Sequence, residues 1–140
     1  MNDSASMSEP SDVRVFVVDD EGYQLACYRD ALGDAEIKAR FFASAGEALL
    51  AAGRCKPAVV LTDYTMPEMN GVELAKRLSE LDQSVRVIIM TGHVGEIFDK
   101  LLATTREMTN VDVVAKPIKL MDLLARINEI LELRDKGLDK

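Results

Sequence analysis

The sequence predicts an α/β fold: an open, doubly wound sheet of five parallel strands with helices on both faces. Short apolar segments rich in β-branched residues alternate five times with longer segments whose apolar residues recur at helical spacing. Alternation of this kind indicates parallel strands joined by right-handed helical crossovers. At 140 residues the chain is long enough to bury such a core as a single domain.

The first strand–helix unit is predicted from residue 13 onward. Residues 13–18 form a continuous β-branched and aromatic run bounded by aspartates, which is typical of a strand buried on both faces. Residues 21–33 follow with apolar side chains on one helical stripe, and Gly33 is expected to end this helix.

The second unit contains the clearest local helix signal. A weaker strand is predicted at residues 36–42. Ser44 and Glu47 then form a capping box, in which each side chain can satisfy a free backbone N–H group. The helix that begins at this box is expected to end near Gly53.

The last three units continue the alternation. In the fourth helix we expect one apolar face that contains Val94, Ile97, Phe98 and Leu101. The final helix begins after Lys119, which is a poor N-cap residue. Strands are predicted at residues 58–61, 85–90 and 111–115, and helices at residues 71–81, 94–108 and from 120 onward.

Polar residues stand at the carboxyl ends of four of these strands. In an open parallel sheet such ends share one edge, and ligands bind where the strand order reverses. In the flavodoxin-like order 2-1-3-4-5, the first and third strands are neighbours at that point, so three aspartates are expected in one crevice. The residues are Asp19 and Asp20 after the first strand, Asp63 after the third, Thr91 and Gly92 after the fourth, and Lys116 and Pro117 after the fifth.

Three neighbouring carboxylates repel one another unless a cation neutralises them. Carboxylate and carbonyl oxygens with room for water suit Mg²⁺, which is therefore the expected cofactor. A carboxylate beside Mg²⁺ can attack a phosphoryl group, and the central Asp63 is the candidate nucleophile. Lys116 can pair with phosphoryl oxygens, Thr91 can donate its hydroxyl, and Gly92 leaves room for the group to enter.

These residues in this order, with the segment "MPEMNG" behind Asp63, resemble the receiver domain of two-component response regulators. The resemblance covers residues 13–134, between a tail at 1–12 that is expected to be disordered and a charged tail at 135–140. It implies a regulatory domain rather than a conventional enzyme. A sensor histidine kinase or phosphotransfer protein would phosphorylate Asp63, and the domain would then switch a protein-interaction face.

The resemblance also implies how the metal is held. Asp63 is the phosphoacceptor and a metal ligand. Asp20 is a direct ligand of Mg²⁺, and Asp19 is a ligand through water or a hydrogen bond. The backbone carbonyl of Thr65 completes the protein's share of the metal shell.

On the phosphate side, the resemblance implies that Thr91 is the switch hydroxyl, that Lys116 binds the phosphoryl group and that the peptide bond to Pro117 is cis. Two features depart from the family pattern. Val113 stands three residues before the lysine, where receivers usually carry Tyr or Phe, and the segment 91–116 is longer than usual. Output through the fourth helix, fifth strand and fifth helix is therefore expected to be modified. A homodimer through this face is a further expectation.

His93 is the only histidine in the chain and admits two interpretations. In one it is an exposed loop residue. In the other it borders the phosphorylation site together with Thr65 and modulates the rate at which water removes the phosphoryl group.

Two alternative functions stay open. The first is a pseudo-receiver that binds partners without phosphorylation, which the missing aromatic residue at Val113 favours. The second is a Mg²⁺-dependent phosphatase with an aspartate nucleophile. That class carries a general-acid Asp two residues after the nucleophile, whereas this chain has Thr65.

Composition restricts the partners. A net charge of −7 and a pI near 4.7 argue against direct binding of nucleic acid or anionic membranes. No segment reaches the apolar length of a membrane span, and the first residues lack the features of a signal peptide, so we expect a cytoplasmic protein. Cys27 and Cys55 have neither metal-type nor redox spacing and are expected to be reduced. The sequence does not identify the downstream target, whether a separate protein or a fused output domain.

Overall fold

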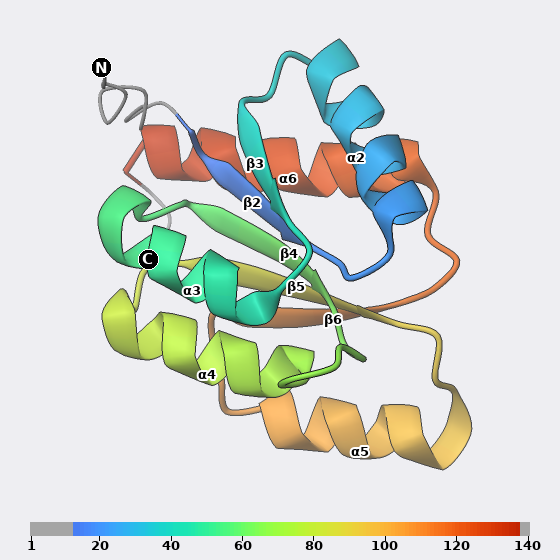
Figure 1. Ribbon diagram of the computed structural model, residues 1–140. Coiled ribbons are helices and arrows are strands. Elements are labelled where there is room, and N and C mark those ends of the chain that lie inside the picture. Colours follow the sequence, from blue (N-terminus) through green and yellow to red (C-terminus); the bar gives the residue numbers. More distant parts are fainter. Residues whose placement is uncertain (1–12, 138–140) are drawn as a thin grey trace.

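The computed structural model describes residues 13–137, which form one parallel sheet between two layers of helices (Figure 1). The predicted α/β architecture and strand order are confirmed, because the five strands lie in the order β3-β2-β4-β5-β6 and every neighbouring pair is parallel. The tail predicted at residues 1–12 and the last residues of the charged tail, 138–140, lie outside the described residues.

The sheet and the helices alternate along the whole described chain. The strands are β2 (Val15–Val18), β3 (Ala39–Phe42), β4 (Val59–Asp63), β5 (Arg86–Thr91) and β6 (Val111–Ala115). The helices are α2 (Gly22–Asp34), α3 (Ala45–Cys55), α4 (Gly71–Leu81), α5 (Gly95–Thr105) and α6 (Leu120–Asp135).

Alternate residues of the strands feed two separate cores. Phe16 and Val18 of β2 pack with α3, α4 and the buried Leu101 of α5, whereas Val15 and Val17 pack with α2 and α6. Because the central strands β2 and β4 are covered on both faces, their apolar residues are wholly buried, as the continuous apolar runs predicted. Figure 1 shows α2 and α6 together on one side of the sheet and α3, α4 and α5 on the other.

Side-chain caps begin two of the helices. The Ser44 hydroxyl accepts a hydrogen bond from the Glu47 N–H at 3.2 Å, which is one half of the predicted capping box. The Asn70 side chain accepts the Glu73 N–H at 2.9 Å at the start of α4. At the start of α6, Lys119 makes no side-chain cap, as expected.

Two helices end one and two residues beyond the glycines at which their ends were predicted. Helix α2 continues past Gly33 to Asp34, and the left-handed residue that follows is Glu36 at φ 61°. Helix α3 continues past Gly53 to Cys55, and Lys56 adopts φ 49°. In both cases backbone N–H groups close the last turn, and a residue other than glycine adopts the left-handed conformation after it.

The apolar face predicted for α5 is only partly buried. Val94 and Ile97 are 74% and 51% exposed, while Leu101 and Thr105 are buried. The reason is the position of the helix. It packs mainly on β6, the edge strand, which is itself only half-buried. Only a narrow part of the surface of α5 is therefore in contact with the sheet. Within residues 13–137, no helix has the length and apolar character that crossing a bilayer requires.

Candidate functional site

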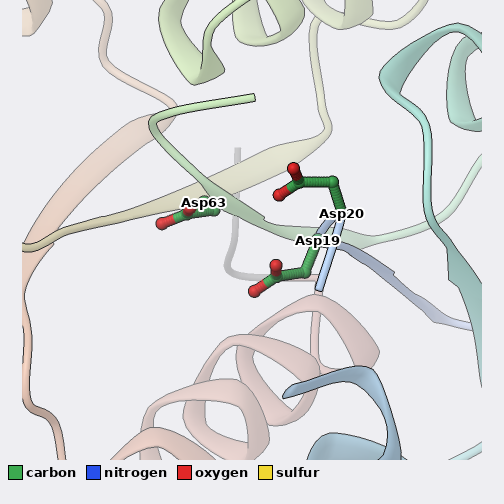
Figure 2. Close-up of side chains that lie close together, drawn as sticks. All are labelled: Asp19, Asp20 and Asp63. Carbon is green, nitrogen blue, oxygen red and sulfur yellow. The ribbon is translucent and has the colours of Figure 1, made fainter. Parts of the chain in front are cut away.

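Three carboxylates meet at the carboxyl edge of the sheet. Strands β2 and β4 are neighbours in register, with Val18 opposite Thr62, so the residues that follow them converge. One oxygen from each of Asp19, Asp20 and Asp63 lies within 4.8 Å of the others. Figure 2 shows the Asp19 and Asp20 side chains at the end of β2 beside the Asp63 side chain from the end of β4.

Asp19 is the buried member of this cluster, with 2% of its surface exposed. Its Oδ1 atom accepts the Glu21 N–H at 3.0 Å, while its Oδ2 atom is buried without a hydrogen-bond partner among the described residues. Burial raises the pKa of the Asp19 carboxyl above its ordinary value, and the negative charge of Asp63 raises it further. A buried carboxylate oxygen without a partner is costly, and a cation bound at the cluster would offset this cost.

Lys116 supplies the positive charge on the opposite side of the cluster. Its Nζ atom lies 2.9 Å from Oδ1 of Asp63, and both side chains are partly buried. The peptide bond between Lys116 and Pro117 is cis. The Lys116 N–H donates to the Thr91 carbonyl at 2.8 Å, so the ends of β5 and β6 hold the lysine beside the acidic cluster.

The backbone of Tyr64, directly after Asp63, is held by hydrogen bonds to β5 and to the first residue of α4. The Tyr64 N–H donates to the Met90 carbonyl, and the Tyr64 carbonyl accepts the Gly71 N–H, each at 2.8 Å. Gly71 must be a glycine for this approach, since a Cβ atom there would lie 3.0 Å from the Asp63 carbonyl oxygen and 3.1 Å from Ile89 Cγ2. The loop therefore sets the position of Asp63 through a close backbone contact.

Thr91, Gly92 and His93 form the neighbouring rim of the site. The Thr91 side chain is buried, and its hydroxyl oxygen accepts the His93 N–H at 3.0 Å. Gly92 is exposed, and a Cβ atom there would contact nothing within 4 Å. Thr65, two residues after Asp63, has an exposed side chain. The structure thus brings the sequence-predicted residues to one edge of the sheet.

Two tyrosines at this edge were not predicted from the sequence as site residues. Tyr28 lies below the cluster on α2, and its hydroxyl donates to Met90 Sδ at 3.4 Å. Burial and the negative charges of Asp19 and Asp63 raise the pKa of Tyr28 to about 12, so it stays protonated at neutral pH. In the sequence, Tyr28 is one residue of an apolar helical stripe, and nothing in that pattern indicates where its hydroxyl lies.

The second tyrosine, Tyr64, lies beside the predicted phosphoacceptor and contacts His93. The two rings meet edge to face, with centroids 5.9 Å apart and planes at 83°. His93 is therefore half-buried rather than fully exposed. The residues are 29 positions apart in the chain, on different loops, so no local sequence pattern predicts the contact.

The cluster fits a hard divalent cation. It offers three carboxylates, one of which has a buried oxygen without a partner, and it opens to solvent at Asp20, which is exposed. Oxygen ligands with space for water are what Mg²⁺ requires. Neither cysteine contributes to this cluster or forms a disulfide.

Comparison with known proteins gives a consistent result. Residues 15–128 match the response regulator receiver domain family. The chain is 29% identical over 122 residues to sporulation initiation phosphotransferase F of Bacillus subtilis, covering 86% of this chain and 95% of that protein. It is 27% identical over 133 residues to the response regulator protein TmoT of Ectopseudomonas mendocina, covering 95% of this chain but only 56% of that protein.

Solved structures agree with the sequence comparison. A CheY-like response regulator receiver domain protein from Methanospirillum hungatei superposes with a TM-score of 0.76 at 26% identity, covering 89% of this chain and 97% of that chain.

Proposed function

This chain belongs to the response regulator receiver family of two-component systems, and on that basis we propose that it accepts a phosphoryl group on Asp63 from a sensor histidine kinase or a phosphotransfer protein. The observation that carries the proposal is the Asp63 carboxylate itself. It lies between two further carboxylates and a lysine ammonium 2.9 Å away, at the sheet edge where ligands bind in this fold.

The proposed reaction is a single displacement at phosphorus. An Asp63 carboxylate oxygen forms the new P–O bond while the bond from phosphorus to the donor's histidine nitrogen breaks, and that nitrogen leaves with the bonding electron pair. Lys116 is close enough to Asp63 to form an ion pair with the phosphoryl oxygens once they are attached. In this proposal the Thr91 hydroxyl donates a hydrogen bond to a second phosphoryl oxygen, and Gly92 leaves room for the group to enter. No water or general base takes part in the transfer.

The proposed metal ligands are the carboxylates of Asp19, Asp20 and Asp63 and the backbone carbonyl of Thr65. Bound Mg²⁺ would supply positive charge to both the nucleophile and the transferring group. The protein's contribution is to hold the acids together before the donor arrives. Asp19 is fixed by the Glu21 N–H, and Asp63 is fixed by the backbone around Gly71.

The alternatives are less well supported. A pseudo-receiver would have no need for three acids around a buried, unpartnered oxygen. A phosphatase would need a proton donor two residues after Asp63, and the exposed Thr65 cannot serve as one. We therefore propose a regulatory domain whose only reactions are its own phosphorylation and dephosphorylation.

We further propose that His93 modulates dephosphorylation. The loop that contains His93 borders the site, and the His93 ring contacts the ring of Tyr64, the residue after the proposed phosphoacceptor. Removing the ring in His93→Ala should change access of water to phosphorylated Asp63 and thus the dephosphorylation rate. Equal rates in the variant and the parent would rule this role out.

The proposed output is a change in protein contacts. Phosphorylation adds about −1.5 to −2 charges at Asp63 and biases the domain toward a second packing. The face formed by α5, β6 and α6 is the proposed output surface, with homodimer formation as one form of output. We propose cytoplasmic signalling without direct contact to nucleic acid, given the net charge of −7.

Intact mass after incubation with acetyl phosphate tests the central proposal. The parent should gain one phosphoryl group only when Mg²⁺ is present, and Asp63→Asn should gain none. Asp30→Asn, which changes an exposed carboxylate on α2, is the matched control and should be modified like the parent. An adduct that persists in Asp63→Asn would show that another residue is the acceptor. If the parent gives no adduct, binding of beryllofluoride distinguishes fast hydrolysis from an inactive site.

A further inference from the structure

The loop between β5 and α5 connects the acidic site to a weakly held helix. We propose that the contacts from Thr91 to His93, and from His93 to Tyr64, transmit the response to α5, in place of an aromatic ring on β6. This inference rests on the proposed phosphorylation of Asp63. It concerns how that event reaches the surface of the molecule, which the proposed function leaves open.

The usual route through β6 lacks its side chain here. Val113 pairs with Ile89, and Thr91 pairs with Ala115, so the Thr91 and Val113 side chains lie on the same face of the sheet. Val113 is a small, half-buried residue that packs into the core on this face. Val113 has no aromatic ring that could turn inward when the Thr91 hydroxyl moves, so its side chain does not couple to that movement.

The Thr91 hydroxyl is instead connected to the backbone of His93. It accepts the His93 N–H at 3.0 Å and is almost fully buried. A phosphoryl group on Asp63 would draw this hydroxyl toward its oxygens. Movement of the hydroxyl then either pulls the His93 backbone along or releases its N–H group, and both outcomes displace the loop.

The His93 ring turns this displacement into a change of packing. It lies edge-on to Tyr64, and the backbone of Tyr64 is held on both sides by hydrogen bonds to Met90 and Gly71. Because the backbone of Tyr64 is held, a displacement of the His93 backbone changes how the two rings meet. Edge-to-face aromatic pairs prefer defined geometries, so a displacement of the His93 ring changes the energy of this contact.

Helix α5 is built to follow such a movement. It begins at Gly95, two residues after His93, with φ +66° and without a side-chain cap from Val94. It buries only Leu101 and Thr105 and packs mainly on the edge strand β6. A helix with so few buried residues has a small local free energy of opening. We therefore expect a displacement of the loop at its first turn to shift the helix.

The test compares two signals in the full chain with Mg²⁺ and beryllofluoride. Fluorine NMR reports whether beryllofluoride is bound at the site, and amide hydrogen exchange by mass spectrometry reports α5. In the parent we expect bound beryllofluoride and a change in exchange across α5. In His93→Ala we expect binding to persist while the α5 change shrinks by about two- to tenfold, the size of one lost aromatic contact.

Matched variants distinguish loss of the proposed coupling through His93 and Tyr64 from a general loss of stability. His93→Phe keeps both the ring and the backbone N–H, and it should retain the α5 response. Tyr64→Leu should lose the response, whereas Tyr23→Leu, at a tyrosine that is 79% exposed on α2, should retain it. Val113→Ala should also leave the response unchanged.

The outcomes distinguish this inference from the proposed function. If the parent binds no beryllofluoride, the proposed function fails and this inference fails with it. If the parent binds beryllofluoride but α5 does not respond, or responds equally in His93→Ala, the proposed function stands and the route through His93 is wrong. Loss of the response in Val113→Ala would assign the coupling to β6 instead.

Discussion

The two sides of the acidic edge differ in how firmly they are held. Strands β2 and β4, which carry the aspartates, lie in the middle of the sheet and are buried on both faces. Helix α5 lies over the edge strand β6, exposes Val94 and Ile97, and begins without a side-chain cap. The carboxylates therefore lie at the ends of the fully buried strands, whereas α5 belongs to the less tightly packed side of the molecule.

This contrast follows from where each strand lies in the sheet. A central parallel strand has helices on both faces and neighbours on both edges, so its end residues have little freedom. An edge strand has one neighbour and less cover. The proposed function uses both properties, because the carboxylates would be held together on the well-packed side while the proposed output face changes at a small cost in packing.

The largest expected effect comes from shortening a buried leucine of α4, compared with shortening an exposed leucine of α5. Leu74→Ala removes a fully buried side chain of α4 and should lower the free energy of unfolding by about 2–5 kcal/mol. Leu102→Ala, on the exposed side of α5, should change it by no more than about 0.5 kcal/mol. Urea denaturation of both variants measures the difference. Equal losses would contradict the comparison, since α5 would then be as firmly packed as α4.

A second substitution tests the backbone contact beneath Asp63. In Gly71→Ala the new methyl group meets the Asp63 carbonyl oxygen at 3.0 Å, so the loop must shift, and we expect a loss of about 1–3 kcal/mol. Gly53→Ala is the matched control. It lies in α3 with open space around it, and it should stabilise the protein by about 0.5–1 kcal/mol. Equal effects at the two glycines, measured by thermal unfolding, would show that the contact does not constrain Asp63.

A third prediction concerns the cost of holding a buried carboxylate at Asp19. The raised pKa of Asp19 means that the folded protein holds this proton more tightly than the unfolded chain does. The ionised carboxylate therefore reduces stability at neutral pH, and this reduction disappears as the pH falls through the raised pKa. In chelator, Asp19→Asn should be more stable than the parent at pH 7, because the amide carries no charge to bury.

The pH dependence and the metal supply the controls for this prediction. The advantage of Asp19→Asn should shrink toward acidic pH, because the parent then carries a neutral carboxyl as well. Mg²⁺ should raise the melting temperature of the parent more than that of Asp19→Asn. An advantage of Asp19→Asn that is independent of pH would mean that charge is not its cause.

The smallest expected effects sharpen the contrast between helix starts. Asn70→Ala removes the cap of α4 and should cost about 1 kcal/mol. Val94→Ser offers α5 the side-chain cap that it lacks and should stabilise the protein by about 0.5 kcal/mol, with slower amide exchange confined to the first turn of α5. Unchanged exchange there would show that the missing cap is not what leaves α5 weakly held.

The sequence predicts the alternation of strands and helices and a parallel sheet from local patterns, whereas the strand order follows the flavodoxin-like arrangement and depends on which distant strands pair. The sequence also determined which polar residues stand at strand ends, because Asp19, Asp63, Thr91 and Lys116 each follow an apolar run whose period is local. These features depend on neighbouring residues, so a linear pattern contains them.

The contacts that these strand-end residues make with one another depend on the tertiary structure. The 2.9 Å contact of Lys116 with Asp63, the unpartnered oxygen of Asp19 and the Tyr64–His93 contact join residues from different loops. The sequence also placed Val94 and Ile97 on a buried face, because helical periodicity indicates which residues align but not how wide a surface they meet. That width is set by the edge position of β6, and an edge exists only once all five strands have paired.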